Sequence, residues 1–157
     1  MPKQASTPLA NPNMVGLPQA DVIAAGLPIP PIDRIKLFSP TQWEDFVLEW
    51  TDSQRSEYST VEKCAGAGDK GRDIIGIISG NDSTWDNFQC KHYDHRLAPT
   101  DVWLELAKLV YYTFHGDYSY PRRYYFAAPQ GVGTTLSNLL RKPALLKSEL
   151  IQNWEKY

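Results

Sequence analysis

The chain has 157 residues, 42% of them hydrophobic and 22% charged, with a formal net charge of −2 and a pI of about 5.9. This length and composition suit one globular domain with its own hydrophobic core. No apolar run approaches the roughly 20 residues that span a bilayer, and no secretory signal opens the chain, so we predict a cytoplasmic protein with no membrane partner. The acidic balance disfavours a protein that merely coats nucleic acid, because such proteins carry a basic surplus.

Residues 1–31 hold scattered Pro, Ala, Asn and Ser without a sustained period, which predicts a flexible tail. Within it, 27–31 is expected to be extended, polyproline-like chain, and 22–25 could form a helical turn only on docking. The folded domain is expected to cover 32–157. Its last helix reaches Tyr157 without a C-cap signal, so we expect the native protein to continue into a further domain.

The first predicted element of the domain is a helix over 40–52. Ser39 has the place of an N-cap, Pro40 that of the first helical residue, and Gln42 completes a capping box. Apolar residues then recur at i, i+3, i+4 and i+7, the spacing of one buried face of a helix. This stripe consists of Trp43, Phe46, Val47 and Trp50.

A meander of three strands follows in the prediction, over 58–64, 72–78 and 85–93, with a hairpin turn at 80–83. The second strand is apolar on both faces and is therefore expected in the middle of the sheet. The elements predicted after it are a helix that begins near 102, a strand over 123–127 and helices over 134–140 and 144–157. The inward residues of the first of these helices are predicted to be Val102, Leu106, Leu109 and Val110. This order indicates an α/β fold, with a mixed four-stranded sheet flanked by helices.

A set of polar residues on two of these strands carries the predicted chemistry. Gln89 and Lys91 share one face of their strand because side chains alternate, whereas the Cys90 side chain points away. Asp73 lies near the start of the adjacent strand, about 5 Å across the sheet. Hydrolysis of a phosphodiester uses a hard cation with oxygen ligands, which Asp73, the Gln89 amide and the Cys90 carbonyl could supply. Lys91 could orient the attacking water and stabilise the charge of the transition state.

A fourth oxygen ligand is expected from the first helix. Glu44 is favoured because it directly follows Trp43, which faces the core. Glu49 is its competitor, and Asp45 is a weaker one. Acids in a first helical turn commonly only favour the helix dipole, which is the structural alternative for Glu44.

These residues form a recognisable pattern. The run from Gly66 to Asp73 reads G-x-G-D-x-G-x-D, Phe88 to Lys91 contains Q-x-K, and a helix with Trp43-Glu44 precedes both. Together they resemble the PD-(D/E)xK nuclease superfamily, and its Mrr-like branch in particular. The stretch 89–93, with Pro99 and 101–103 beyond it, further resembles the endonuclease domains of anti-phage effectors of the CBASS type with SAVED sensors and of the Lamassu type.

The resemblance covers residues 32 to about 135 and implies a restriction-endonuclease-like fold. It further implies Mg²⁺-dependent cleavage of DNA, mainly double-stranded and with little sequence preference, with Mn²⁺ able to substitute. The implied partners are DNA, a sensor domain or partner subunit, and further copies of the chain in the active state. Two departures from the pattern are Gln89, where an acid is commoner, and the lack of a proline before Asp73.

Several assignments remain open at this stage. A catalytically inactive module that binds DNA or a partner, or an RNA-directed nuclease, would fit the same pattern. A dinucleotide site at 66–71 is disfavoured, because a β-branched run follows it where that motif needs a helix. The three histidines, His92, His95 and His115, are predicted to be structural. The residues predicted to contact DNA are Lys70, Arg72, Arg122, Arg123, Arg141 and Lys142.

Overall fold

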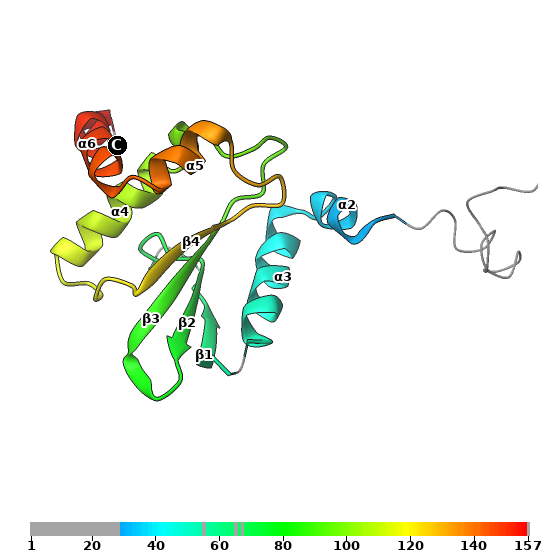
Figure 1. Cartoon of the computed structure of the whole chain (residues 1–157). Helices are drawn as coiled ribbons and strands as arrows, with labels where there is room; N and C mark the ends of the chain where they lie inside the picture. The colour runs from blue at the N-terminus through cyan, green and yellow to red at the C-terminus, as the bar shows by residue number, and fades with distance from the viewer. Residues whose placement is uncertain (1–28, 55, 65, 67, 157) are drawn as a thin grey trace, which may run out of the picture. The chain divides into compact units, whose positions relative to one another are not determined.

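The structure is a computed structural model that describes residues 29–54, 56–64, 66 and 68–156 (Figure 1). The predicted flexible tail, including the segment 22–25, lies outside the described residues except for its last three positions. Pro31 is not extended chain as predicted but the first residue of helix α2 (Pro31–Lys36). Asp33 in its first turn and Lys36 in its last suit the helix dipole, and the two form an ion pair of 3.0 Å.

The rest of the chain is an α/β fold on a mixed sheet with the strand order β1-β2-β3-β4. Neighbouring strands are antiparallel from β1 to β3, and β4 lies parallel to β3. The predicted mixed four-stranded sheet and the central place of its second strand are therefore confirmed. The strands are β1 (Tyr58–Lys63), β2 (Ile74–Ile78), β3 (Asn81–Cys90) and β4 (Arg123–Ala127).

The third strand departs most from its predicted bounds, 85–93. It begins earlier because the hairpin is tighter than expected, with Asn81 already opposite Ile78. It ends earlier, at Cys90, because β4 beside it ends at Ala127. Strand length is thus decided by the neighbouring strand and not by the local sequence.

Helix α3 (Pro40–Asp52) covers one face of the sheet (Figure 1). Its predicted capping box is present: the Gln42 backbone N–H donates to Ser39 Oγ at 3.2 Å, and the Ser39 N–H donates to Gln42 Oε1 at 2.8 Å.

The predicted apolar stripe of α3 is right for two of its four residues. Trp43 and Val47 are buried, whereas Phe46 and Trp50 are 38% and 50% exposed. Phe46 stacks on Trp43 at a ring-centroid distance of 5.5 Å, and Trp50 meets the edge of Phe88 at 6.1 Å. The sheet therefore buries only part of the apolar face of α3, and Phe46 and Trp50 lie at the edge of the contact. The buried core on this face consists of Trp43, Val47, Tyr58, Ile74 and Phe88.

The helices that follow β3 gather on the opposite side of the sheet (Figure 1). They are α4 (Trp103–Phe114), α5 (Thr134–Leu140) and α6 (Pro143–Asn153), with short 3₁₀ helices η1 (Pro99–Asp101) and η2 (Trp154–Lys156). A second hydrophobic core lies on this side of the sheet. It consists of Leu97, Val102, Trp103, Leu136 and Leu139.

The inward face of α4 also differs from the prediction. Val102 is buried as expected, but Val110 is 43% exposed. Trp103, Glu105 and Ala107 are buried in its place. Among the described helices, none combines the length and the apolar character that a membrane crossing requires.

Candidate functional site

Asp73 and Gln89 meet at one end of the sheet, on the face that α4 covers. Ile74 lies opposite Phe88 in the register, which puts Asp73 level with Gln89. The Gln89 Nε2 and the Cys90 backbone N–H both donate to Asp73 Oδ2, each at 2.7 Å. The structure therefore brings together the two residues that the sequence predicted as ligands from separate strands.

The electrostatic surroundings of Asp73 are unfavourable for its negative charge. Burial raises the pKa of the Asp73 carboxyl above its ordinary value, and the charges of Glu44 and Glu105 raise it further. The hydrogen bonds from the Cys90 N–H and from Gln89 act in the opposite direction but do not reverse the shift. A cation bound among these carboxylates would relieve this repulsion.

A hydrogen bond of Trp43 attaches helix α3 to this end of the sheet. The indole N–H of Trp43 donates to the Ala127 carbonyl at 3.1 Å, and the Lys91 backbone N–H donates to the same oxygen at 2.8 Å. Trp43 is 6% exposed, so its ring is held on all sides. The charge of the next residue, Glu44, raises the pKa of Asp73 and of Cys90.

Of the three acids considered on α3, Glu44 is among the main causes of the raised pKa of Asp73. Glu49 is exposed. Glu44 Oε2 pairs with Lys63 Nζ at 3.1 Å, and Asp45 shares that ammonium at 2.8 Å. Hydrogen bonding to Asp45, and then to Glu44, raises the pKa of Lys63.

Lys91 lies on the same side as Gln89, and its ammonium is held by Glu105 of α4. The Nζ–Oε1 distance is 2.7 Å, and the two side chains are only 12% and 9% exposed. The second Glu105 oxygen pairs with Lys108 at 3.3 Å. Glu105 was not among the residues predicted from the sequence. A signal for it was present, because this acid stands three residues after Val102, within the buried stripe of the helix.

Tyr124 is a second residue that sequence reasoning did not assign to the site. Its hydroxyl donates to Gln89 Oε1 at 3.0 Å. Burial raises the pKa of Tyr124, and the nearby charges of Glu105 and Asp73 add to that effect. The hydroxyl therefore stays protonated and holds Gln89 in place, and Gln89 itself is 4% exposed.

The donor atoms of the site determine whether a hard cation such as Mg²⁺ can bind there. Within the described residues, no group of three or more His, Cys, Asp and Glu side chains forms a metal site. Amide and backbone oxygens must therefore complete the set, as the pattern of Asp73, Gln89 and the Cys90 carbonyl predicts. Both hydrogen bonds above end on Asp73 Oδ2, which leaves Oδ1 to face a cation.

The Gln89 amide presents its nitrogen to Asp73 and its oxygen to Tyr124. To serve as a ligand, the amide has to present its oxygen to the cation instead. The Tyr124 hydroxyl can accept a hydrogen bond as well as donate one, so it can pair with either end of the amide. The residues present therefore fit an oxygen-ligated cation such as Mg²⁺.

Three of the basic residues predicted to contact DNA have partners within the domain. Lys70 pairs with Asp117. The Arg72 guanidinium lies 4.6 Å from the centroid of the Tyr118 ring. Arg122 Nε donates at 2.9 Å to Asp86, which is fully buried. Contacts of these three side chains with DNA remain predictions.

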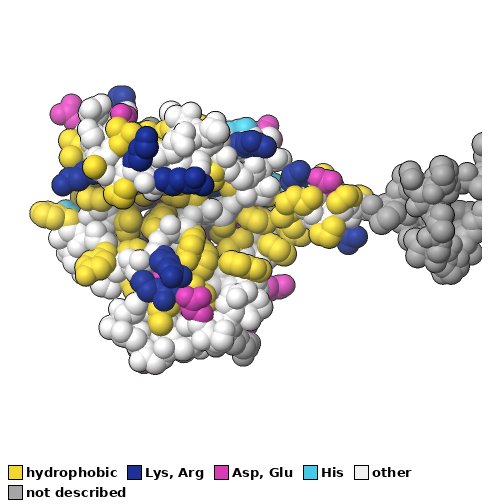
Figure 2. All heavy atoms as spheres, viewed as in Figure 1, with side chains coloured by type: hydrophobic (Ala, Val, Ile, Leu, Met, Phe, Trp, Pro, Cys, Tyr) yellow, Lys and Arg dark blue, Asp and Glu magenta, His cyan; other side chains and the backbone are white. Residues whose placement is uncertain are grey.

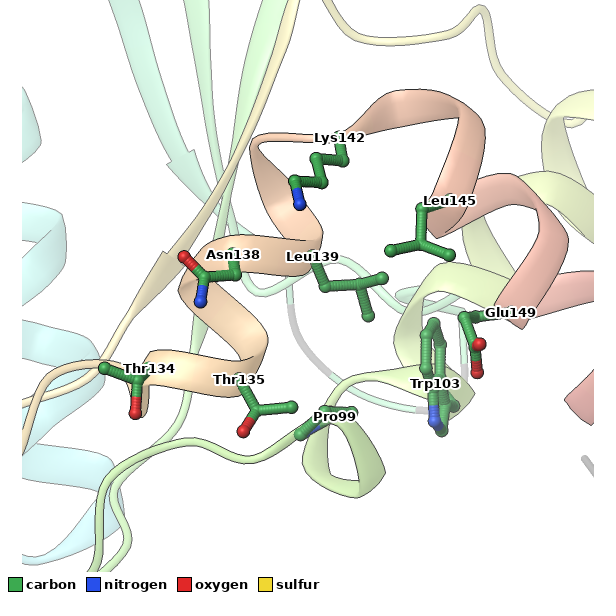
Figure 3. Close-up of a pocket in the computed structure, with 9 residues that line it drawn as sticks. All are labelled: Pro99, Trp103, Thr134, Thr135, Asn138, Leu139, Lys142, Leu145 and Glu149. Carbon is green, nitrogen blue, oxygen red and sulfur yellow. The ribbon is translucent and has the colours of Figure 1, made fainter.

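The other three lie at the surface. Arg123 is 54% exposed and donates to the Tyr125 hydroxyl at 3.2 Å, while Arg141 and Lys142 are exposed at the end of α5. Figure 2 shows Lys and Arg side chains in several groups around hydrophobic side chains on one face. Lys142 and Trp103 both line a cavity of about 510 Å³ (Figure 3). None of the predicted catalytic residues lines that cavity.

The three histidines contact residues other than Asp73, Gln89 and Lys91. His92 Nε2 lies 3.2 Å from the Ile35 carbonyl, and His95 Nε2 lies 3.3 Å from Asp101. His115 is the C-cap of α4. The structural roles of the three residues remain predictions.

Comparison with family models, with curated proteins and with solved structures finds no match for this chain.

Proposed function

We propose that this chain is a Mg²⁺-dependent nuclease domain that hydrolyses DNA phosphodiester bonds, with a restriction-endonuclease-like fold of the PD-(D/E)xK type. One observation carries the proposal. Asp73, Gln89 and Lys91 share one face at the end of two strands, and the charge of Glu44 on α3 acts on Asp73. Metal-assisted phosphodiester hydrolysis requires oxygen ligands for the metal, and a positive charge beside them, here the Lys91 ammonium, can stabilise the transition state.

In this proposal the metal is held by Asp73 and Glu44, with the Gln89 amide oxygen and the Cys90 carbonyl completing the protein ligands. When bound, Mg²⁺ polarises the phosphoryl oxygen and lowers the pKa of a water molecule. Asp73 and Glu44 orient that centre, and Tyr124 keeps Gln89 in its place. Lys91 presents its ammonium to the phosphate, where it stabilises the charge that develops in the transition state.

Burial makes these groups effective. The side chain of Lys91 is 12% exposed, so its charge acts in a medium of lower dielectric constant than water. Tyr124 already contacts the Gln89 amide before any substrate arrives, and its hydroxyl can pair with either end of that amide.

DNA is the substrate that the proposal favours, in double-stranded form and with little sequence preference. Arg123, Arg141 and Lys142 are exposed and supply phosphate contacts of the kind that give affinity without specificity. The formal net charge of −2 means that one copy holds duplex DNA weakly at physiological salt. We therefore propose that the active form is a homo-oligomer, controlled by a sensor domain or partner subunit, in cytoplasmic anti-phage defence.

The direct test is cleavage of plasmid DNA with Mg²⁺, with Mn²⁺ and with EDTA, alongside single-stranded DNA and RNA of the same sequence. We expect cutting of duplex DNA that needs the metal and is lost in Asp73→Ala. Glu149→Gln is the matched control, because Glu149 lies on α6, away from the site. Binding without cleavage under all conditions would identify an inactive module, and preferential cutting of RNA would identify an RNA-directed nuclease.

Self-association is tested separately. One site hydrolyses one strand, so a double-strand break requires two sites or two successive events. Duplex cleavage is measured against protein concentration while light scattering gives the mass. Efficient cutting of both strands by a strictly monomeric sample, with a rate linear in protein, would contradict the oligomeric proposal.

A further inference from the structure

Glu105 lies on the buried face of α4 and contacts the ammonium of Lys91. The two side chains are 9% and 12% exposed, and their charged atoms are 2.7 Å apart. A lysine side chain has a long, flexible stem, so its ammonium takes up many positions unless a partner holds it. The Glu105 carboxylate provides such a partner from a different element of the fold.

Lys108, one helical turn further along α4, holds the other oxygen of the Glu105 carboxylate. The distance is 3.3 Å, and the Lys108 side chain is 39% exposed. The ammonium groups of Lys91 and Lys108 therefore share the Glu105 carboxylate, and the three side chains together carry one net positive charge. Glu105 can thus position Lys91 without cancelling the cationic character of the group as a whole.

The glycine-rich loop before β2 makes room for this arrangement. Gly71 has a φ of +77°, which favours glycine. A Cβ built on it would lie 2.8 Å from Lys108 Cδ and 3.0 Å from Lys108 Cβ. The stem of Lys108 therefore passes directly over the loop that leads to Asp73.

We propose that Glu105 is the positioning residue for Lys91, and that Lys108, packed against Gly71, holds Glu105 in place. This inference rests on the proposed nuclease function. It adds α4 to the site and gives the last glycine of the loop a role in placing Lys108. Glu105 acts through Lys91 and does not hold the metal.

The kinetic test uses Glu105→Gln, which keeps the shape of the side chain and removes its charge, with Glu149→Gln as the control. We expect kcat to fall by about 10- to 100-fold, as is common when the partner of a functional group is removed. KM and Mn²⁺ affinity stay unchanged. In a Lys91→Met background, Glu105→Gln causes no further loss, because the residue has nothing left to position. An equal loss in both backgrounds, or weaker Mn²⁺ binding, would overturn the proposal.

A second measurement does not depend on cleavage. Acetic anhydride modifies accessible amines, and mass spectrometry of peptides reports the modified fraction of Lys91 against that of exposed Lys147. We expect Glu105→Gln to raise the modification of Lys91 and leave Lys147 unchanged. Lys108→Met should raise it by a smaller amount, and this variant serves if Glu105→Gln does not fold. If the wild-type protein cuts no substrate, the proposed nuclease function is wrong. The labelling still tests whether Glu105 positions Lys91. Unchanged labelling of Lys91 in the folded variants would overturn the inference.

Discussion

Replacement of Lys91 by methionine tests both the chemistry and the energetics of the site. Methionine keeps most of the stem and removes only the ammonium. Loss of one preorganised group that stabilises a transition state commonly costs about 10²–10³ in rate, or about 2.7–4 kcal/mol. We therefore expect single-turnover cleavage of plasmid DNA by Lys91→Met to fall by about that factor.

The same change should lower stability, because Glu105 loses its 2.7 Å partner while remaining 9% exposed. Removal of one partner of a buried ion pair costs about 3–5 kcal/mol. Lys108 stays at 3.3 Å from the carboxylate, so the smaller value of a charged hydrogen bond, about 1.5–3 kcal/mol, applies. At about 2–4 °C per kcal/mol, Tm should fall by about 3–12 °C.

Circular dichroism gives Tm on the same samples, and Lys147→Met is the control because Lys147 is exposed on α6. Wild-type cleavage by a folded Lys91→Met protein would refute the assignment of Lys91. A lost rate with an unchanged Tm would keep the assignment and refute the energetic reasoning about the buried pair.

Three further outcomes are expected. The raised pKa of Asp73 means that its ionisation costs folding free energy, absent below the ordinary carboxyl pKa and complete above the raised one. Metal-free Asp73→Asn should therefore unfold at a higher temperature than the wild type at pH 8. The difference should shrink as the pH falls through the raised pKa and vanish below the ordinary one; a less stable variant at pH 8 would contradict this. Calorimetric titration with Mn²⁺ should show weaker binding by Glu44→Gln than by Glu49→Gln, and equal losses would mean that the wrong helix acid was chosen. Tyr58→Phe removes a hydroxyl that donates at 2.9 Å to buried Asp86, so urea unfolding should show a loss of about 1.5–3 kcal/mol, and an unchanged midpoint would show that this bond contributes nothing.

The features that could be predicted from the sequence depend on residues close along the chain or on the period of a strand. The capping box at Ser39 and Gln42 involves atoms three residues apart, so local sequence decides it. Gln89 and Lys91 share a face because strand side chains alternate. The meander also placed Asp73 beside Gln89, since the turn between two adjacent strands limits their register.

Tertiary structure decided the features that depend on distant partners. The pairing of Lys91 with Glu105 needs α4 to cross the end of β3, which no local pattern specifies. Arg122 donates to buried Asp86, a contact between residues of separate segments, whereas the sequence predicted only a contact of Arg122 with DNA. The same holds for the exposure of Val110, because the buried width of a helix depends on what packs against it. Side-chain period predicts which residues share a face, but only the assembled layers determine which of those residues meet and which are left in water.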